Sequence, residues 1–250
     1  MPELDPSAER VLVALVRGLR SLDIRFCVVG ALVPELLLNE RPAQATLDAD
    51  VVVFVPDLAA FERVKNGLVG FQPGKHPCRL RHESGGRADI LPYSEELAPD
   101  GVLRLEPDYV FNMTGFERVA GATVEVTLDG GEIAPVVVVP LYVLLKLVAY
   151  TDRRLEKDIA GVVHCLRNYA EDDERRFGLR HQGTAVPYEY GSAYLLGVDG
   201  QPFLDDKLRK LIGPLLERLI PPDIDMDDDE PDRERENRQY LRWFRMGLEI

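Results

Sequence analysis

The amino-acid sequence predicts an α+β (α/β) fold, in which a mixed β-sheet flanked by helices is followed by a helical C-terminal part. Up to about residue 139, short β-branched and apolar runs alternate with amphipathic helical patterns, and helical spacing dominates after that point. The chain has 250 residues, of which 46% are hydrophobic. This length and composition are enough to bury one sizeable core, with or without a helical appendage.

The first part of the chain carries the strand signals. Two glycine-containing segments, Glu83–Gly86 and Asp129–Gly131, have the composition of hairpin turns. In chain order, we expect a helix at Ser7–Arg20, a strand at Ile24–Val29, a helix at Ala31–Leu38, a strand at Asp50–Val55, a helix at Leu58–Leu68, and strands at Cys78–His82, Arg87–Leu91, Phe116–Ala120, Thr123–Leu128 and Ile133–Val139.

Pro140 marks the change to helical spacing, because proline is favourable at the first position of a helix. The pattern predicts two helices or one bent helix over Leu141–Tyr169, and further helices at Phe203–Leu219 and Arg233–Leu248. The apolar residues expected to pack the last helix on the body of the protein are Tyr240, Trp243, Phe244 and Leu248. We therefore expect a core at residues 1–140, a helical part at 141–220 that completes a cleft, and an acidic linker with a terminal helix at 221–250.

Charge and cysteine content limit the function classes. The formal net charge is −13, and the segment Pro221–Glu236, with nine acids and two arginines, accounts for more than half of it. An acidic balance of this kind gives no support for a broad nucleic-acid-binding surface, although a small basic pocket is compatible with it. The acidic stretch around Asp223–Glu230 has the composition of a solvated linker.

The three cysteines, Cys27, Cys78 and Cys165, lack paired spacing, so we expect neither a disulfide framework nor a zinc site. Unpaired cysteines fit a reducing compartment. The N-terminus has no signal-peptide pattern and no apolar run is long enough to cross a bilayer. We therefore expect a cytoplasmic protein without a membrane segment.

Three carboxylates interrupt β-rich apolar sequence, and they are the main candidates for chemistry. Asp48 and Asp50 are two residues apart, so on a strand both point to the same side, and Asp89 follows inside a later strand. Each has an ordinary explanation, as a residue at a strand end or on an exposed edge strand. Taken together, the three are typical of a site for two Mg²⁺ ions that assist phosphoryl transfer, in which the third carboxylate completes a metal site and helps to deprotonate a hydroxyl.

Two further features suit a phosphate-bearing ligand. Gly30 and Ala31 form a turn between a strand and a helix, where backbone can approach an anion closely, although such a glycine often marks only a tight turn. Lys146 is the only charge in an apolar helical stretch, so it either reaches solvent or faces a polar cleft. On one continuous helix, Arg153 and Lys157 share its stripe and could bind a triphosphate or form an ordinary solvated face, and Arg154 could pair with Asp158.

The chain resembles the nucleotidyltransferase (DNA polymerase beta-like) superfamily, and within it the AbiEii-type toxin nucleotidyltransferases and their bacterial relatives. The segments that carry the resemblance are Val28–Ala31, Thr46–Val52, Ala88–Pro92, and Leu144–Leu147 continuing through Arg153 to Asp158, which together span over half of the chain. The turn departs from the family pattern at Ala31, where a glycine or serine usually stands.

The resemblance implies a nucleotidyltransferase-like sheet, an NTP donor and magnesium. It implies Asp48, Asp50 and Asp89 as metal ligands and catalytic residues, and Gly30, Ala31, Lys146, Arg153 and Lys157 at the nucleotide. We expect transfer of an NMP to a hydroxyl or phosphate on tRNA, a protein or a small molecule. The alternative is a catalytically silent nucleotide- or partner-binding module on the same fold. Either could belong to a toxin–antitoxin system with a cognate antitoxin.

Overall fold

The computed structural model describes residues 4–42, 46–171, 173–220 and 232–250, and it divides into two compact units, Met1–Val138 and Val139–Ile250. The acidic linker predicted around Asp223–Glu230 lies outside the described residues. No helix within the described ranges is long and apolar enough to cross a membrane.

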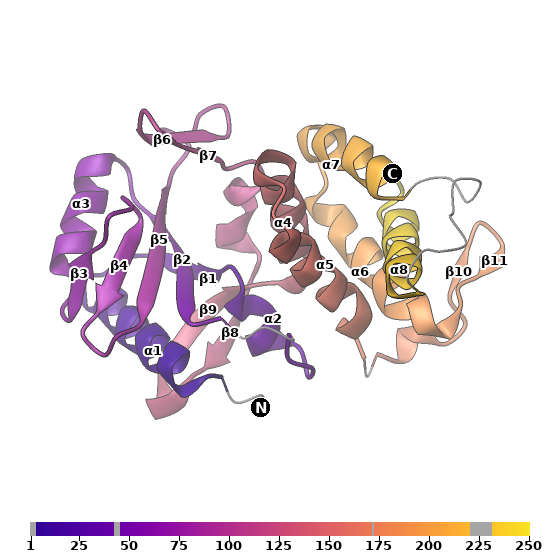
Figure 1. The fold of residues 1–250 in the computed structure, drawn as a ribbon, viewed down its shortest axis with the longest axis horizontal. Helices are drawn as coiled ribbons and strands as arrows, with labels where there is room; N and C mark the ends of the chain where they lie inside the picture. Colours follow the sequence, from indigo (N-terminus) through magenta and orange to yellow (C-terminus); the bar gives the residue numbers. More distant parts are fainter. Residues whose placement is uncertain (1–3, 43–45, 172, 221–231) are drawn as a thin grey trace. The chain divides into compact units, whose positions relative to one another are not determined.

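The first unit is built on a seven-stranded sheet with the strand order β3-β4-β5-β2-β1-β9-β8 (Figure 1). β2 runs parallel to β5 and β1 runs parallel to β9, whereas the other neighbours are antiparallel, so the sheet is mixed as expected. The strands are β1 (Phe26–Val29), β2 (Asp48–Phe54), β3 (Phe71–Pro73), β4 (Arg79–His82), β5 (Arg87–Tyr93), β8 (Thr123–Thr127) and β9 (Ile133–Val137).

Three helices accompany this sheet: α1 (Pro6–Ser21), α2 (Leu32–Leu37) and α3 (Leu58–Gly67). The Asp5 side chain accepts hydrogen bonds from the first turn of α1 and caps it. The predicted apolar face of α1 is fully buried, and the helix packs against β2 and β5. The same two strands carry the candidate acids, so α1 supports the part of the sheet that holds them.

Two expectations for the first unit need correction. Phe116–Ala120 is not a strand, because the segment forms the 3₁₀ helix η1 (Phe116–Gly121) after Gly115, whose φ of 93° turns the chain. A short apolar run alone does not separate these two structures. The strand β3 was not predicted, nor was a separate hairpin of β6 (Val102–Glu106) and β7 (Tyr109–Asn112), which stands apart from the main sheet (Figure 1).

The second unit is mainly helical, with a two-stranded ribbon of β10 (Arg180–His181) and β11 (Thr184–Ala185). The segment predicted as two helices or one bent helix forms two, and Arg154, with a φ of 48°, lies at the break. The main helices are α4 (Val139–Arg153), α5 (Glu156–Asn168), α6 (Gly191–Gly200), α7 (Asp206–Leu219) and α8 (Asp232–Leu248). Of these, α6 was not expected.

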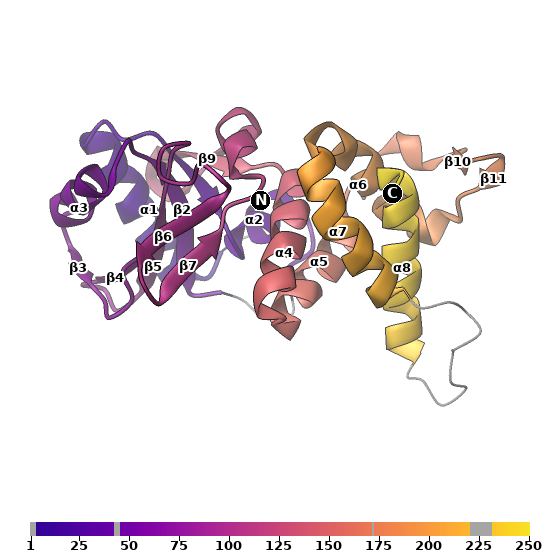
Figure 2. The same cartoon turned by 90° about the horizontal axis from the view of Figure 1, so that it is seen from above.

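The terminal helix α8 packs mainly on α6 and also contacts α5 and α7 (Figures 1 and 2). Tyr240, Phe244 and Leu248 are buried there, which confirms most of the predicted apolar face, whereas Trp243 is half-buried. At the crossing, a Cβ atom on Gly247 would overlap the carbonyl oxygen of Tyr194, and one on Gly197 would overlap that of Phe244. Glycine at both positions therefore lets the two backbones approach closely.

Candidate active site

The candidate acids lie on one face of two neighbouring parallel strands. Along β2, Asp48 and Asp50 are half-buried, while Ala49 and Val51 between and after them are fully buried. This alternation confirms that both acids point to the same side of the sheet. The opposite face belongs to the apolar core.

Strand register brings the third acid to the pair. Asp50 on β2 is the Cα partner of Asp89 on β5, and on its other side it is the partner of Val29, the last residue of β1. Asp89 in turn lies opposite Arg79 on β4. The structure therefore brings together the acids that are 39 residues apart in the sequence, in a cross-strand row that ends at an arginine.

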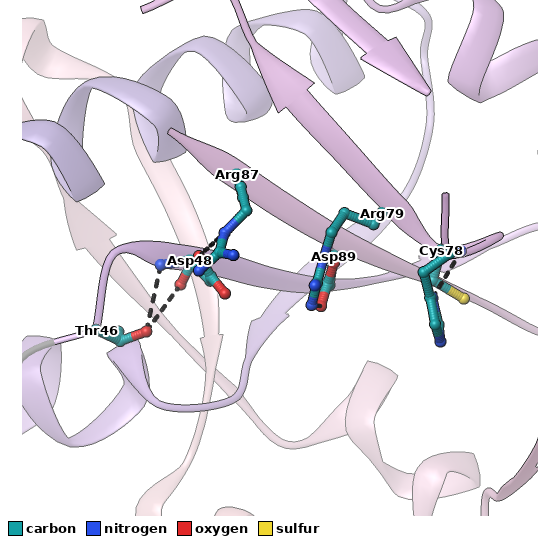
Figure 3. Close-up of polar contacts among 7 residues, drawn as sticks. Thr46, Asp48, Cys78, Arg79, Arg87 and Asp89 are labelled. Atoms are coloured by element: carbon teal, nitrogen blue, oxygen red, sulfur yellow. Dashed lines mark hydrogen bonds and ion pairs between the residues drawn. The ribbon is translucent and has the colours of Figure 1, made fainter. Parts of the chain in front are cut away.

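Arg79 and Asp89 form a two-fold contact. The arginine Nε donates to Oδ1 at 2.8 Å and Nη2 donates to Oδ2 at 2.7 Å (Figure 3). The hydrogen bonds to Asp89, opposed in part by burial and reinforced by the charges of Asp89, Asp48 and Asp50, raise the pKa of Arg79 above its usual range. Arg79 was not among the predicted site residues, and the structure adds it to the candidate site.

A second arginine contacts the first acid. Arg87 Nε donates to Asp48 Oδ1 at 2.8 Å, and these two residues are Cα partners on β5 and β2 (Figure 3). The Arg87 side chain is 49% exposed, compared with 35% for Arg79. Arg87 is therefore the more exposed of the two arginines that contact the carboxylates.

A buried glutamate fixes the start of β2. Glu35 on α2 is 3% exposed and accepts a hydrogen bond from Thr46 N at 3.1 Å, while the Thr46 hydroxyl accepts one from Asp48 N at 3.2 Å. Burial raises the pKa of Glu35, and the Thr46 bond and the Arg41 charge offset part of that shift. This role of Glu35 was not predicted, although Glu35 is the single acid in the otherwise apolar helix expected at Ala31–Leu38.

Gly30 follows β1 and approaches the acid pair directly. Its φ is 77°, and a Cβ atom at this position would overlap the Asp50 carboxylate. The expected close approach of backbone is therefore present, and its partner in the structure is Asp50. Ala31 caps the six-residue helix α2 without a side-chain hydrogen bond, so any contact from this turn to an anion would have to come from backbone N–H groups.

Cys78 lies beside this row of residues (Figure 3). Its side chain is buried, and burial together with the Asp89 charge raises its pKa to about 12. A thiol with such a pKa stays protonated at neutral pH. Cys78 is therefore a poor candidate for a nucleophile beside this row.

The predicted phosphate-binding cations lie in the second unit, and two of them, Lys146 and Arg153, share one buried acid. Lys146 Nζ is 3.1 Å from Asp158 Oδ1, and Arg153 donates to both oxygens of Asp158 at 2.7 Å. The Asp158 side chain is 0% exposed, and that of Lys146 is 15% exposed. The Lys146 ammonium is thus largely buried and held by an ion pair with a fully buried acid.

Two predictions about the cations near Lys146 were wrong. The pairing expected between Arg154 and Asp158 is replaced by pairing with Arg153 and Lys146, because the chain breaks at Arg154 and α5 starts anew at Glu156. Lys157, which is exposed on α5, is consequently on a different helix from Lys146. A continuous-helix pattern does not apply across such a break.

The donor chemistry of the acid row suits Mg²⁺, which prefers carboxylate oxygens. Asp48, Asp50 and Asp89 present such oxygens on one face of adjacent strands. In the side-chain conformations seen, no set of three His, Cys, Asp or Glu residues in the described part of the chain is gathered as a metal site. Asp48 and Asp89 are instead turned towards arginines, so a metal ion would have to compete with these contacts.

No protein-family model and no curated protein matches this sequence. Among solved structures, the chain is similar to an antigenic nucleotidyltransferase-like protein from Paracoccidioides brasiliensis, with a TM-score of 0.50 and 15% identity, covering 87% of this chain and 91% of that one. It is also similar to JHP933 from Helicobacter pylori, with a TM-score of 0.42 and 14% identity, covering 99% and 95% of the two chains.

A third similar structure is the CdnE cyclic dinucleotide synthase of Elizabethkingia meningoseptica, with a TM-score of 0.29, 10% identity and coverage of 98% of this chain and 93% of that one. The fold comparison rests on the first of the three. The mixed sheet with flanking helices, followed by a helical part, is thereby confirmed, and this chain has the nucleotidyltransferase-like fold.

Proposed function

We propose that this protein transfers a nucleoside monophosphate from an NTP to a hydroxyl or phosphate acceptor with the help of magnesium, with pyrophosphate as the leaving group. The observation that carries the proposal is the placement of Asp50 directly opposite Asp89, beside Gly30, on the sheet of a nucleotidyltransferase-like fold. Two facing carboxylates repel each other and are retained most readily where they bind a cation.

The three acids would have different roles in this reaction. Asp48 and Asp50 would hold magnesium, and Asp89 would be the third carboxylate, which orients the acceptor hydroxyl and receives its proton. Bound there, magnesium would supply positive charge at the transferring phosphate and at its attacking and leaving oxygens. Gly30 leaves room for the Asp50 carboxylate, and the Glu35–Thr46 contact fixes the strand that carries the pair.

The phosphate-binding part is assigned to the cations of the second unit. Lys146 and Arg153 are the residues proposed to neutralise the triphosphate, with Lys157 as a further contact. Both Lys146 and Arg153 are engaged by Asp158, so binding of phosphate requires them to share or exchange that partner. An acidic chain favours a small or local acceptor site over a broad nucleic-acid surface.

Direct NTP binding and transfer test the proposal. Wild type, Asp48→Ala and Asp50→Ala are titrated with each labelled NTP in the presence and absence of Mg²⁺, with Asp108→Ala, in the β6–β7 turn, as the control. We expect magnesium-dependent binding that both site variants lose and the control keeps. Binding that is unchanged in Asp48→Ala and Asp50→Ala would contradict the proposed site.

Mass spectrometry of an acceptor mixture after the reaction identifies the product. The mixture contains tRNA, proteins and small hydroxyl compounds, so an added NMP mass assigns the acceptor class. A cognate antitoxin, as for AbiEii-type toxins, is tested by adding the product of a neighbouring gene and measuring whether transfer stops.

A catalytically silent nucleotide- or partner-binding module is the second candidate. The contacts of Asp48 with Arg87 and of Asp89 with Arg79 favour it, because arginines at both acids partly neutralise them without a metal ion. The same assays separate the two functions. NTP binding without transfer to any acceptor supports the module, whereas transfer supports the enzyme.

A further inference from the structure

The contact between Arg79 and Asp89 differs from an ordinary surface ion pair in its geometry. Both Nε and Nη2 donate, one to each carboxylate oxygen, at 2.8 and 2.7 Å. Two parallel bonds of this kind fix the orientation of the carboxylate as well as its charge. The pair also lies in strand register, so the backbone holds both residues at the distance that the contact needs.

The backbone of Arg79 is anchored at both of its polar groups. Its N–H donates to the His76 carbonyl at 2.9 Å, and its carbonyl accepts from Gly74 N at 2.7 Å. A guanidinium that starts from a fixed backbone and bonds to two oxygens is pre-positioned over Asp89. Arg87, in contrast, reaches Asp48 through one nitrogen and one oxygen and is about half exposed.

Charge limits how many further cations such a site can hold. Arg79 already lies against Asp89 and Arg87 against Asp48, so two positive charges are in place beside the acids. A second ion at Asp89 would lie beside the Arg79 guanidinium, and like charges at such a separation repel strongly in a partly buried site.

We infer that Arg79 takes the place of a second metal ion at Asp89, so that the site binds a single divalent cation on Asp48 and Asp50. This inference rests on the proposed function, because it specifies the metal content of the same site. Arg79 is then a positioning residue that fixes Asp89 and limits the number of metal ions. Arg87 is the cation that yields when the ion reaches Asp48.

Calorimetric titration of the full chain with Mn²⁺, a substitute for Mg²⁺, tests the inference, with and without a non-hydrolysable ATP analogue. The variants are Arg79→Gln, Arg79→Lys and Asp50→Asn, and Arg104→Gln, an exposed arginine on β6, is the matched control. We expect one ion per wild-type chain. Arg79→Gln should bind a second ion or bind Mn²⁺ at least tenfold more tightly, because Asp89 is released.

The conservative variant separates charge from packing. Arg79→Lys keeps the positive charge and should keep the wild-type stoichiometry, whereas a merely structural role for Arg79 predicts weaker binding in both Arg79 variants. Circular dichroism confirms that each variant is folded before titration. Two ions on the wild-type chain overturn the inference even if Arg79→Gln does not fold.

The outcomes also distinguish this inference from the proposed function. One ion that Asp50→Asn abolishes, with Arg79→Gln identical to wild type, overturns the role of Arg79 and leaves the metal site standing. Absence of binding in wild type and in all variants overturns both. A second or tighter ion in Arg79→Gln, with Arg104→Gln unchanged, supports the inference.

Discussion

Asp50 and Asp89 face each other across the parallel strands β2 and β5, and Arg79 binds Asp89 from the far side. Directly opposed like charges destabilise a sheet unless a cation compensates for them. The arginine provides that compensation within the fold itself. The acid row is therefore partly neutralised within the fold itself.

The close approach of Gly30 to Asp50 predicts a large effect of a single methyl group. Gly30→Ala should lower the free energy of unfolding by about 2–4 kcal/mol, because it combines backbone strain at positive φ with overlap of the Asp50 carboxylate. Gly130→Ala is the control, since Gly130 has a similar φ of 74° and open space around it. Urea unfolding of both variants isolates the overlap, and equal losses would contradict this account.

The buried acid in the second unit should be sensitive to removal of its charge. Asp158→Asn leaves Lys146 and Arg153 without their shared partner, and we expect a loss of about 3–5 kcal/mol, as for other broken buried ion pairs. Asp152→Asn, at an exposed position on α4, should change stability by less than about 0.5 kcal/mol. Urea unfolding checks both, and a small effect at Asp158 would mean that the cations are held by other contacts.

The same carboxylate predicts a dependence of stability on pH. Burial alone would raise the pKa of Asp158, but the hydrogen bonds of Arg153 and the charge of Lys146 outweigh it, so the pKa in the folded protein lies below its ordinary value. An acid with a lowered pKa stabilises the fold fully above the pKa of the unfolded chain, at about 4, and loses that contribution as the pH falls through the folded pKa.

Unfolding free energies of wild type and Asp158→Asn between pH 2 and 7 measure this contribution. The difference between the two proteins should be constant above about pH 5 and should shrink as the pH falls below about 4. A difference that grows towards acid pH would show that the carboxylate is protonated in the native protein.

The glycine contact between α6 and α8 predicts which helical glycine is essential for packing. Gly247→Ala should destabilise the second unit by about 2–4 kcal/mol, because the added methyl group meets the Tyr194 carbonyl and the helices must separate. Gly213→Ala on α7 meets no neighbour within 4 Å and should change stability by less than about 1 kcal/mol. Thermal unfolding followed by circular dichroism compares the two, and similar midpoints would argue against close helix packing.

Local sequence patterns located most of the helices and strands correctly. The apolar face of α1, the hairpin of β4 and β5, and the antiparallel pair of β8 and β9 all follow from periodicity and turn composition. The helix α6 escaped because most of its ten residues are buried and it lacks the alternation of polar and apolar faces. The strand β3 escaped because three residues give too little periodicity to separate strand, helix and turn. Phe116–Gly121 failed for the same reason.

The spacing of Asp48 and Asp50 by itself determined that both acids share one face, because the period of a strand is two residues. Only the tertiary structure decided the partners of the charged groups. Arg79 reaches Asp89 through hairpin register, in which a shift by one residue would turn the arginine to the opposite face. Lys146 meets Asp158 because the chain breaks at Arg154 and α5 packs on α4. Pairings of this kind depend on how separate elements come together, and local periodicity carries no record of that.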